Sequence, residues 1–152
     1  RWKKRQKIVD EIQNEELKSK QLLNITKKEK KEIIEDEISE NEPSVENKSN
    51  AIEKYLNIEN LIYLKLASRY KVNYETLQNI RIDRFSFDII LKSRFIEKRG
   101  DLIVEVKYFK KLPPNSKLKE LINSFLIATN TYEDTQKRKT THHNLENMVL
   151  IF

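Results

Sequence analysis

Cysteine is absent from the 152-residue chain, and glycine occurs only once, at Gly100. The missing thiols exclude disulfides, thiolate catalysis and zinc sites built from cysteine. No stretch approaches the roughly 18 consecutive apolar residues of a membrane helix, and no short apolar core follows the basic start as in a signal peptide. The composition therefore predicts a soluble protein, for which a cytoplasmic location is the compatible compartment.

The first residues suggest an alternative location. The chain begins at Arg1, and its opening "RWKKRQK" places Trp2 among basic residues, as the cytoplasmic flank of a membrane helix often does. A tether upstream, which would hold the chain at the cytoplasmic face of a membrane, is the alternative to a free protein. An arbitrary start of the sequence explains the same residues without a tether.

Charge is abundant but unevenly distributed. The net charge is +6 at pH 7, and residues 51–152 carry 18 basic residues against 12 acidic ones, whereas residues 1–50 are balanced. A basic domain favours polyanionic partners, nucleic acid first among them. Richness in Lys, Asn and Ile also follows from a biased genome, so charge by itself leaves a nucleic-acid partner open.

The pattern of apolar residues divides the chain near Asn50. Residues 3–40 form a polar, helix-favouring tract, which predicts a solvated helix or helix pair. The segment "SENEPSVENKSN" at 39–50 contains Pro43 and reads as a linker. We therefore expect a charged helical tail at 1–49 and one folded domain at 50–152.

Within the domain the pattern predicts a helix, three strands, a helix and a strand. Asn50 is placed to cap a helix from Ala51 to about Tyr70, whose apolar residues recur at helical spacing. Short β-branched or aromatic segments predict the strands, and an amphipathic helix follows "LPPNS". The predicted strands are 75–83, 85–93, 102–109 and 147–152.

The stretch "DLIVEVKYF" at 101–109 interrupts an apolar strand with Glu105 and Lys107. Side chains two positions apart face the same way, so these two charges are neighbours. If residues 85–109 form an antiparallel hairpin, residues whose numbers sum to about 193 face each other, which places Asp88 opposite Glu105. Paired carboxylates suit Mg²⁺ or Mn²⁺, and a nearby lysine suits the orientation of a nucleophile or the stabilisation of a phosphate.

These residues resemble a known family. "FDIIL", a turn and then "IVEVK", set in an αβββαβ order, are similar to the PD-(D/E)xK nuclease superfamily, which has the restriction-endonuclease-like fold. The resemblance covers about residues 51–152 and implies an α/β fold with a mixed central sheet flanked by helices. It implies that Asp88 and Glu105 are metal ligands and Lys107 the catalytic lysine. Phe87 stands where the motif has Pro.

The same resemblance implies a further glutamate from the first helix, for which Glu59 is the best match and Glu53 the reserve. It implies a Mg²⁺-dependent endonuclease that hydrolyses phosphodiester bonds with Mg²⁺ or Mn²⁺ and needs no small-molecule cofactor. DNA is expected ahead of RNA, from the breadth of the family alone. A homodimer is compatible, because two copies of one site often cut the two strands of a duplex.

Several alternatives remain open at this point. Glu-x-Lys also occurs three times before residue 50, and the trio could be a half-exposed cross-strand salt bridge worth about 0.2–1 kcal/mol. The domain could also be a catalytically silent, nuclease-like module that binds nucleic acid or a partner protein. Arg138 and His143 match the Arg-x4-His spacing of the HEPN ribonucleases, but that family is all-helical, and chance explains the spacing better. Weaker candidates for backbone contacts with a nucleic acid are Tyr108, Lys110, Lys111 and residues 142–144.

Overall fold

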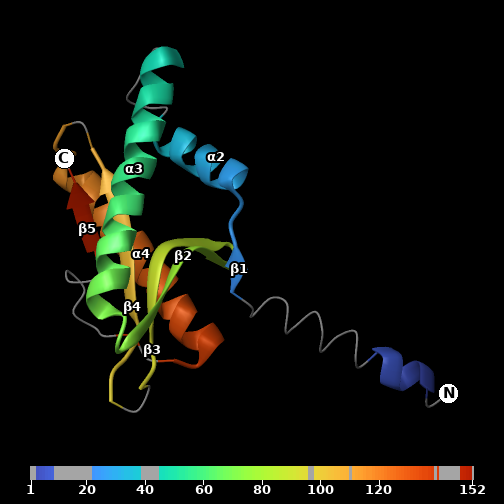
Figure 1. Cartoon of the computed structure of the whole chain (residues 1–152). Helices are drawn as coiled ribbons and strands as arrows, with labels where there is room; N and C mark the ends of the chain where they lie inside the picture. The colour runs from blue at the N-terminus through green and yellow to red at the C-terminus, as the bar shows by residue number, and fades with distance from the viewer. Residues whose placement is uncertain are drawn as a thin grey trace.

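The computed structural model describes residues 3–8, 22–38, 45–95, 98–109, 111–138, 140 and 148–151, and of 45–47 and 148–151 the backbone alone. Residues 3–8 are helical and lie well away from the rest of the chain (Figure 1). The remaining elements run in the order β1 (Leu23–Asn24), α2 (Lys27–Ile38), α3 (Val45–Tyr70), β2 (Tyr74–Ile82), β3 (Phe85–Ser93), β4 (Leu102–Tyr108), α4 (Asn115–Gln136) and β5 (Met148–Ile151). The predicted strands are confirmed to within one residue at each end, and the predicted second helix is present as α4.

The first predicted helix is longer than expected. α3 begins at Val45, so Asn50 lies inside the helix and is not its N-cap. The predicted linker at 39–50 is therefore wrong for 45–50, while 39–44 lie outside the described residues. The Ser and Asn residues of this stretch are poor helix formers individually, but they continue a helix whose later turns pack on the sheet.

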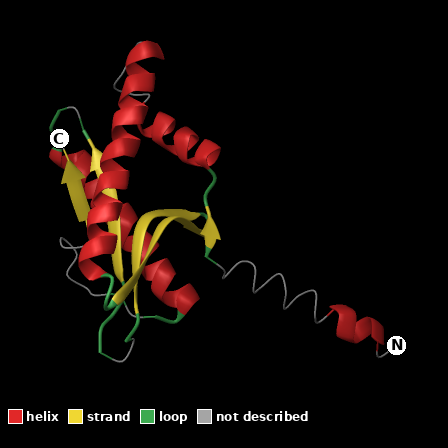
Figure 2. Cartoon of the chain, viewed as in Figure 1, coloured by secondary structure: helices red, strands yellow, loops and turns green. Residues whose placement is uncertain are grey.

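The sheet has the order β1-β2-β3-β4-β5. β1 to β4 pair antiparallel, and β5 pairs parallel to β4 after the chain has crossed over through α4. Figure 2 shows α3 and α4 on opposite sides of this sheet. The protein is thus a mixed α/β fold with flanking helices.

Two apolar clusters hold these layers together. One packs the sheet against α4 and includes Phe125 and Tyr132, and the other packs it against α3 through Ile58, Ile62 and neighbouring side chains. Residues of β3 and β4 contribute to both clusters, because alternate side chains of a strand point to opposite faces. Burial on both faces explains why "LIVEV" and "DIIL" read as almost continuous apolar runs.

The alternation of faces changes phase in the middle of β2 and β3. Leu77 and Ile80 pack in the same cluster although they are three residues apart, and so do Phe87 and Ile90. Asn79 lies between the first pair with φ of 53°, in the left-handed region. Its cross-strand position corresponds to Asp88, and this one pair is missing from an otherwise continuous β2–β3 register. The chain is therefore irregular next to the predicted acidic residue.

A buried polar cluster, which we call the Asp101 clamp, fixes the far end of the β3–β4 hairpin. Asp101 is 1% exposed and accepts hydrogen bonds from Ser93 N (2.7 Å), the Tyr132 hydroxyl (2.6 Å) and Arg138 Nε (2.6 Å). Arg138 also donates to Ser93 O at 2.8 Å. The guanidinium of Arg138 is thus bound to Asp101 and Ser93 in a structural role, whereas His143 lies outside the described residues. The Arg-x4-His spacing gains no support from this arrangement.

Helix α2 comes from the segment predicted to be a solvated tail. One of its faces, formed by Lys30, Ile34 and Ile38, is buried, and Ile34 and Ile38 pack with Tyr55 of α3. The expectation of a solvated helix is therefore wrong for this face of residues 27–38. The division into 1–49 and 50–152 as separate domains stays a prediction.

Candidate functional site

The predicted pairing of Asp88 with Glu105 rests on a register that the structure confirms. Ile89 pairs with Val104, Ile90 with Ile103 and Leu91 with Leu102, so each pair sums to 193 as predicted. The next pair along this register is Asp88 and Glu105. The backbone ladder stops before this pair, and the strands are joined there by side chains.

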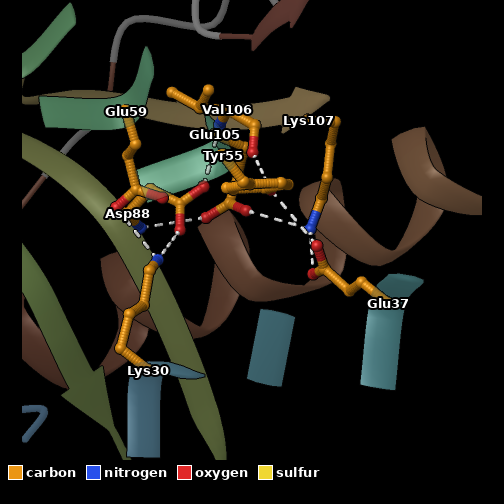
Figure 3. Close-up of polar contacts among 8 residues, drawn as sticks. All are labelled: Lys30, Glu37, Tyr55, Glu59, Asp88, Glu105, Val106 and Lys107. Carbon is orange, nitrogen blue, oxygen red and sulfur yellow. Dashed lines mark hydrogen bonds and ion pairs between the residues drawn. The ribbon is translucent and has the colours of Figure 1, made fainter. Parts of the chain in front are cut away.

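Asp88 and Glu105 cross-link the two strands where the backbone ladder ends. Asp88 Oδ2 accepts a hydrogen bond from Val106 N at 2.8 Å, and Glu105 Oε1 accepts one from Asp88 N at 3.3 Å. Each carboxylate thus replaces a backbone carbonyl as the acceptor. This leaves one further oxygen of each side chain directed to other groups, and Figure 3 shows both carboxylates facing the same cluster.

Glu59 of α3 reaches the same cluster, as predicted, and Glu53 does not. Glu59 is 1% exposed, and Lys30 Nζ lies 3.0 Å from its Oε1. Glu59 Oε1 thus forms an ion pair with Lys30, while Oε2 has no hydrogen-bond partner among the described residues. Glu53 is exposed, on another face of α3.

Lys107, the predicted catalytic lysine, has two acidic neighbours. Its Nζ lies 3.8 Å from Glu105 Oε2 and donates a hydrogen bond to Glu37 Oε1 at 2.6 Å. Glu37 belongs to α2, and its Oε2 accepts a hydrogen bond of 3.2 Å from the hydroxyl of Tyr55. The Tyr55 hydroxyl also contacts Val106 O, which ties α3 to β4 beside the site.

Lys30 was not predicted and lies at the centre of the carboxylates. Its ammonium group donates a hydrogen bond to Asp88 Oδ1 at 2.6 Å while it pairs with Glu59, and only 7% of its side chain is exposed. A sequence signal for it existed, because Lys30 lies four and eight residues before Ile34 and Ile38 and so continues their helical face. Glu37 and Tyr55 gave no comparable signal in the sequence.

Burial and neighbouring charges shift the pKa values of the ionisable groups in the site. Burial and repulsion by Asp88 raise the pKa of Glu59 to about 7, although Lys30 opposes the shift. Burial and Asp88 likewise raise the pKa of Glu105 well above its ordinary value, against the attraction of Lys107. For Lys107 and Lys30, burial lowers the pKa but the neighbouring carboxylates outweigh it, so the net shift is upward.

Besides burial, an unequal number of acidic and basic groups contributes to these pKa shifts. Among the residues that the structure describes, the cluster holds four carboxyl groups, from Glu37, Glu59, Asp88 and Glu105, against two ammonium groups, from Lys30 and Lys107. Fully ionised, it would carry two surplus negative charges in a largely buried place, which favours uptake of protons or of a cation.

No family model, curated protein or solved structure matches the chain. The chemistry of the site therefore rests on its own residues.

The donor set suits a divalent cation in charge and in atom type. Carboxylate oxygens are the ligands that Mg²⁺ and Mn²⁺ prefer. Buried Glu59, whose Oε2 has no hydrogen-bond partner among the described residues, shares the ammonium of Lys30 with Asp88. Asp88, Glu105 and Glu59 are the residues that could hold such an ion. As they stand, the described residues include no group of three or more acidic or His side chains spaced to bind a metal, and the ammonium of Lys30 takes the position between Asp88 and Glu59.

None of the helices in the described ranges is long and apolar enough to cross a membrane. Lys111 is exposed near the end of β4, while Lys110 and residues 142–144 lie outside the described residues. The weaker candidates for nucleic-acid contacts thus remain sequence predictions.

Proposed function

We propose that this domain is a Mg²⁺- or Mn²⁺-dependent nuclease that hydrolyses phosphodiester bonds, with DNA as the expected substrate, on a restriction-endonuclease-like fold. The observation that carries the proposal is the meeting of Asp88 and Glu105 where the β3–β4 ladder ends, with Lys107 at 3.8 Å from Glu105. Buried Glu59 of α3 supplies a third carboxylate to the same cluster, which supports the proposal further. The antiparallel β2–β3–β4 strands, followed by a helix and a parallel strand, agree with the fold that the sequence resemblance implies.

Each residue of the site would have a distinct role in the proposed reaction. Asp88 and Glu105, with Glu59, would hold the cation, which when bound supplies a more acidic water and positive charge beside a phosphate. Lys107 would orient the attacking water or stabilise the charge that develops on the phosphate, because its ammonium lies next to a ligand carboxylate. The basic excess of residues 51–152 would bind the nucleic-acid backbone.

The test is a cleavage assay across substrate classes. Purified protein is incubated with supercoiled plasmid, linear duplex, single-stranded DNA and RNA, each with Mg²⁺, Mn²⁺ or EDTA. We expect cutting of duplex DNA that requires the metal, with nicked plasmid as the first product of a monomer and linear plasmid as the first product of a homodimer. If no substrate is cut with either metal, the proposed activity is wrong.

One observation favours a second candidate, a catalytically silent module that binds nucleic acid or a partner protein. The ammonium of Lys30 already neutralises Asp88 and Glu59, so the fold has an internal cation where a nuclease needs an external one. Such a module would bind DNA without cutting it and would not be stabilised by Mg²⁺. Thermal unfolding with and without Mg²⁺ distinguishes the two candidates.

A further inference from the structure

Helix α2 contributes two side chains of opposite charge to the candidate site. Lys30 contacts the carboxylates of Asp88 (2.6 Å) and Glu59 (3.0 Å), and Glu37 contacts the ammonium of Lys107 (2.6 Å). Both residues belong to α2, and Figure 3 shows Lys30 beside the carboxylates of Asp88 and Glu59 and Glu37 beside Lys107. Three of the four groups of the proposed active site, Asp88, Glu59 and Lys107, are thus paired with a charge from α2.

The charges match the two ligands that a nuclease site must bind. The ammonium of Lys30 supplies positive charge at hydrogen-bonding distance from carboxylate oxygens, which is where a divalent cation would bind. The carboxylate of Glu37 accepts hydrogen bonds from Lys107 and Tyr55, as an anionic phosphate oxygen would. Lys30 and Glu37 are seven residues apart, close to two helical turns, so one helix face presents both.

The apolar attachment of α2 is small compared with the two clusters that hold the sheet. Ile34 and Ile38 pack on Tyr55, with partly buried neighbours around them, and this cluster is separate from those formed with α3 and α4 on the sheet. No described residue of α2 belongs to either main cluster, so displacement of the helix would leave both clusters in place. The ion pairs of Lys30 and Glu37 are the ones that a cation and a phosphate would replace, while the pair between Glu29 and Arg81 of β2 lies outside the site and is partly exposed.

We infer that α2 occupies the site in the unbound protein, with the ammonium of Lys30 in the place of the divalent cation and the carboxylate of Glu37 in the place of the phosphate. Binding of these ligands displaces the helix. This inference rests on the proposed function for the identity of the ligands. It adds that the cation and α2 compete for Asp88 and Glu59, so α2 stays on the site until metal and nucleic acid together replace all three ion pairs.

The first test measures Mn²⁺ binding by calorimetry to the full chain and to variants of α2. We expect Lys30→Gln to bind Mn²⁺ at least tenfold more tightly than the wild type, and Glu37→Gln, which leaves the carboxylate pairs intact, to bind it within about twofold. Lys31→Gln and Glu35→Gln alter exposed residues of the same helix and serve as matched controls that should change nothing. Weaker Mn²⁺ binding by folded Lys30→Gln would overturn the inference.

The second test measures displacement of α2 without relying on Lys30 variants. Because the chain has no cysteine, Ile34→Cys introduces a single thiol at a position that is 1% exposed between α2 and α3. We expect its reaction with a thiol reagent to accelerate at least tenfold when Mn²⁺ and a DNA duplex are added together. Val104→Cys, buried under α3, is the control and should stay protected.

The two tests separate this inference from the proposed nuclease activity. Tighter Mn²⁺ binding by Lys30→Gln, without cleavage of any nucleic acid, would support the inference and contradict the nuclease. Metal-dependent cleavage by the wild type with Ile34→Cys protected throughout would support the nuclease and overturn the inference. Loss of cleavage in Lys30→Gln with Mn²⁺ binding unchanged would also overturn it, because Lys30 would then be a catalytic residue.

Discussion

Glu59 is the residue whose protonation should be visible in the stability of the fold. Its pKa is raised to about 7 by burial and by Asp88, so the folded state binds this proton more tightly than the unfolded state does. Stability from this group is fully present below the ordinary glutamate pKa and is lost as pH rises through about 7. We expect a loss on the order of 1–3 kcal/mol across this window in metal-free buffer.

Urea unfolding at several pH values between about 4.5 and 8 measures this dependence. Glu59→Gln keeps the shape of the side chain and removes the titration, so its pH profile should be flatter than that of the wild type. Glu53→Gln, on an exposed face of α3, is the matched control and should keep the wild-type profile. An equally steep profile in Glu59→Gln would contradict the assignment.

Asp101 is the residue whose loss should harm the fold without touching the site. Asp101→Asn removes the charge that the Arg138 guanidinium and the Tyr132 hydroxyl contact at 2.6 Å each. Breaking a buried pair from one side typically costs about 3–5 kcal/mol, and we expect a loss of that size by urea unfolding. Asp134→Asn, on the exposed side of α4, should cost less than about 0.5 kcal/mol. A loss below 1 kcal/mol for Asp101→Asn would show that the clamp matters little.

At the scale of elements, the left-handed residue Asn79 in β2 is what changes the phase of the alternation beside Asp88. A β-branched residue is disfavoured in this conformation, so we expect Asn79→Val to destabilise the protein by about 1–2 kcal/mol. Asn79→Gly should stay within about 1 kcal/mol, because glycine adopts a positive φ without a steric penalty and removes a buried amide oxygen that lacks a hydrogen-bond partner. Equal unfolding free energies for the Val and Gly variants would contradict this role.

The same elements show how far the sequence could predict the structure. Strands, the second helix and the 193 register followed from apolar periodicity and from the spacing of the hairpin, since both are local properties. The trio of Asp88, Glu105 and Lys107 followed from that register. The change of phase at Asn79 could not be predicted, because asparagine is also compatible with a regular strand position.

The sequence did not predict that α2 contributes Lys30 and Glu37 to the site, and the reason is physical. A helix rich in Lys and Glu is typical of a solvent-exposed element, and the burial of Lys30 becomes favourable only when Asp88 and Glu59 are brought beside it from 58 and 29 residues away. Glu37 likewise finds Lys107 only in the folded chain. Pairings over such sequence distances are tertiary properties that no local pattern carries.

For the whole molecule, the proposed metal site predicts that Mg²⁺ or Mn²⁺ stabilises the fold. A ligand present at about a hundred times its Kd contributes about 2.7 kcal/mol, which for a chain of this length raises Tm by about 5–10 °C. We expect this shift for the wild type and for Asp134→Ala, and no shift for Asp88→Ala. An equal shift in Asp88→Ala would place the metal elsewhere, and no shift in the wild type would favour the silent module.

Binding of the whole domain to nucleic acid should depend steeply on salt. The excess of 18 basic over 12 acidic residues in 51–152 implies several contacts with backbone phosphates. With several such contacts, the Kd for a DNA duplex, measured by fluorescence anisotropy, should weaken by at least tenfold between about 50 and 200 mM salt. A Kd that is constant over this range would argue against a nucleic-acid partner.

In the proposed nuclease, Lys107, beside Asp88 and Glu105, supports metal-dependent phosphodiester hydrolysis. The most direct measurement is the initial rate of plasmid cleavage in Mg²⁺ for the wild type, Lys107→Ala and Lys111→Ala. We predict that Lys107→Ala lowers the rate by about 10²-fold or more while Mn²⁺ binding persists, and that Lys111→Ala, which removes an exposed lysine near the end of the same strand, stays within a few fold. Full activity in Lys107→Ala, or an equal loss in both variants, would contradict the account.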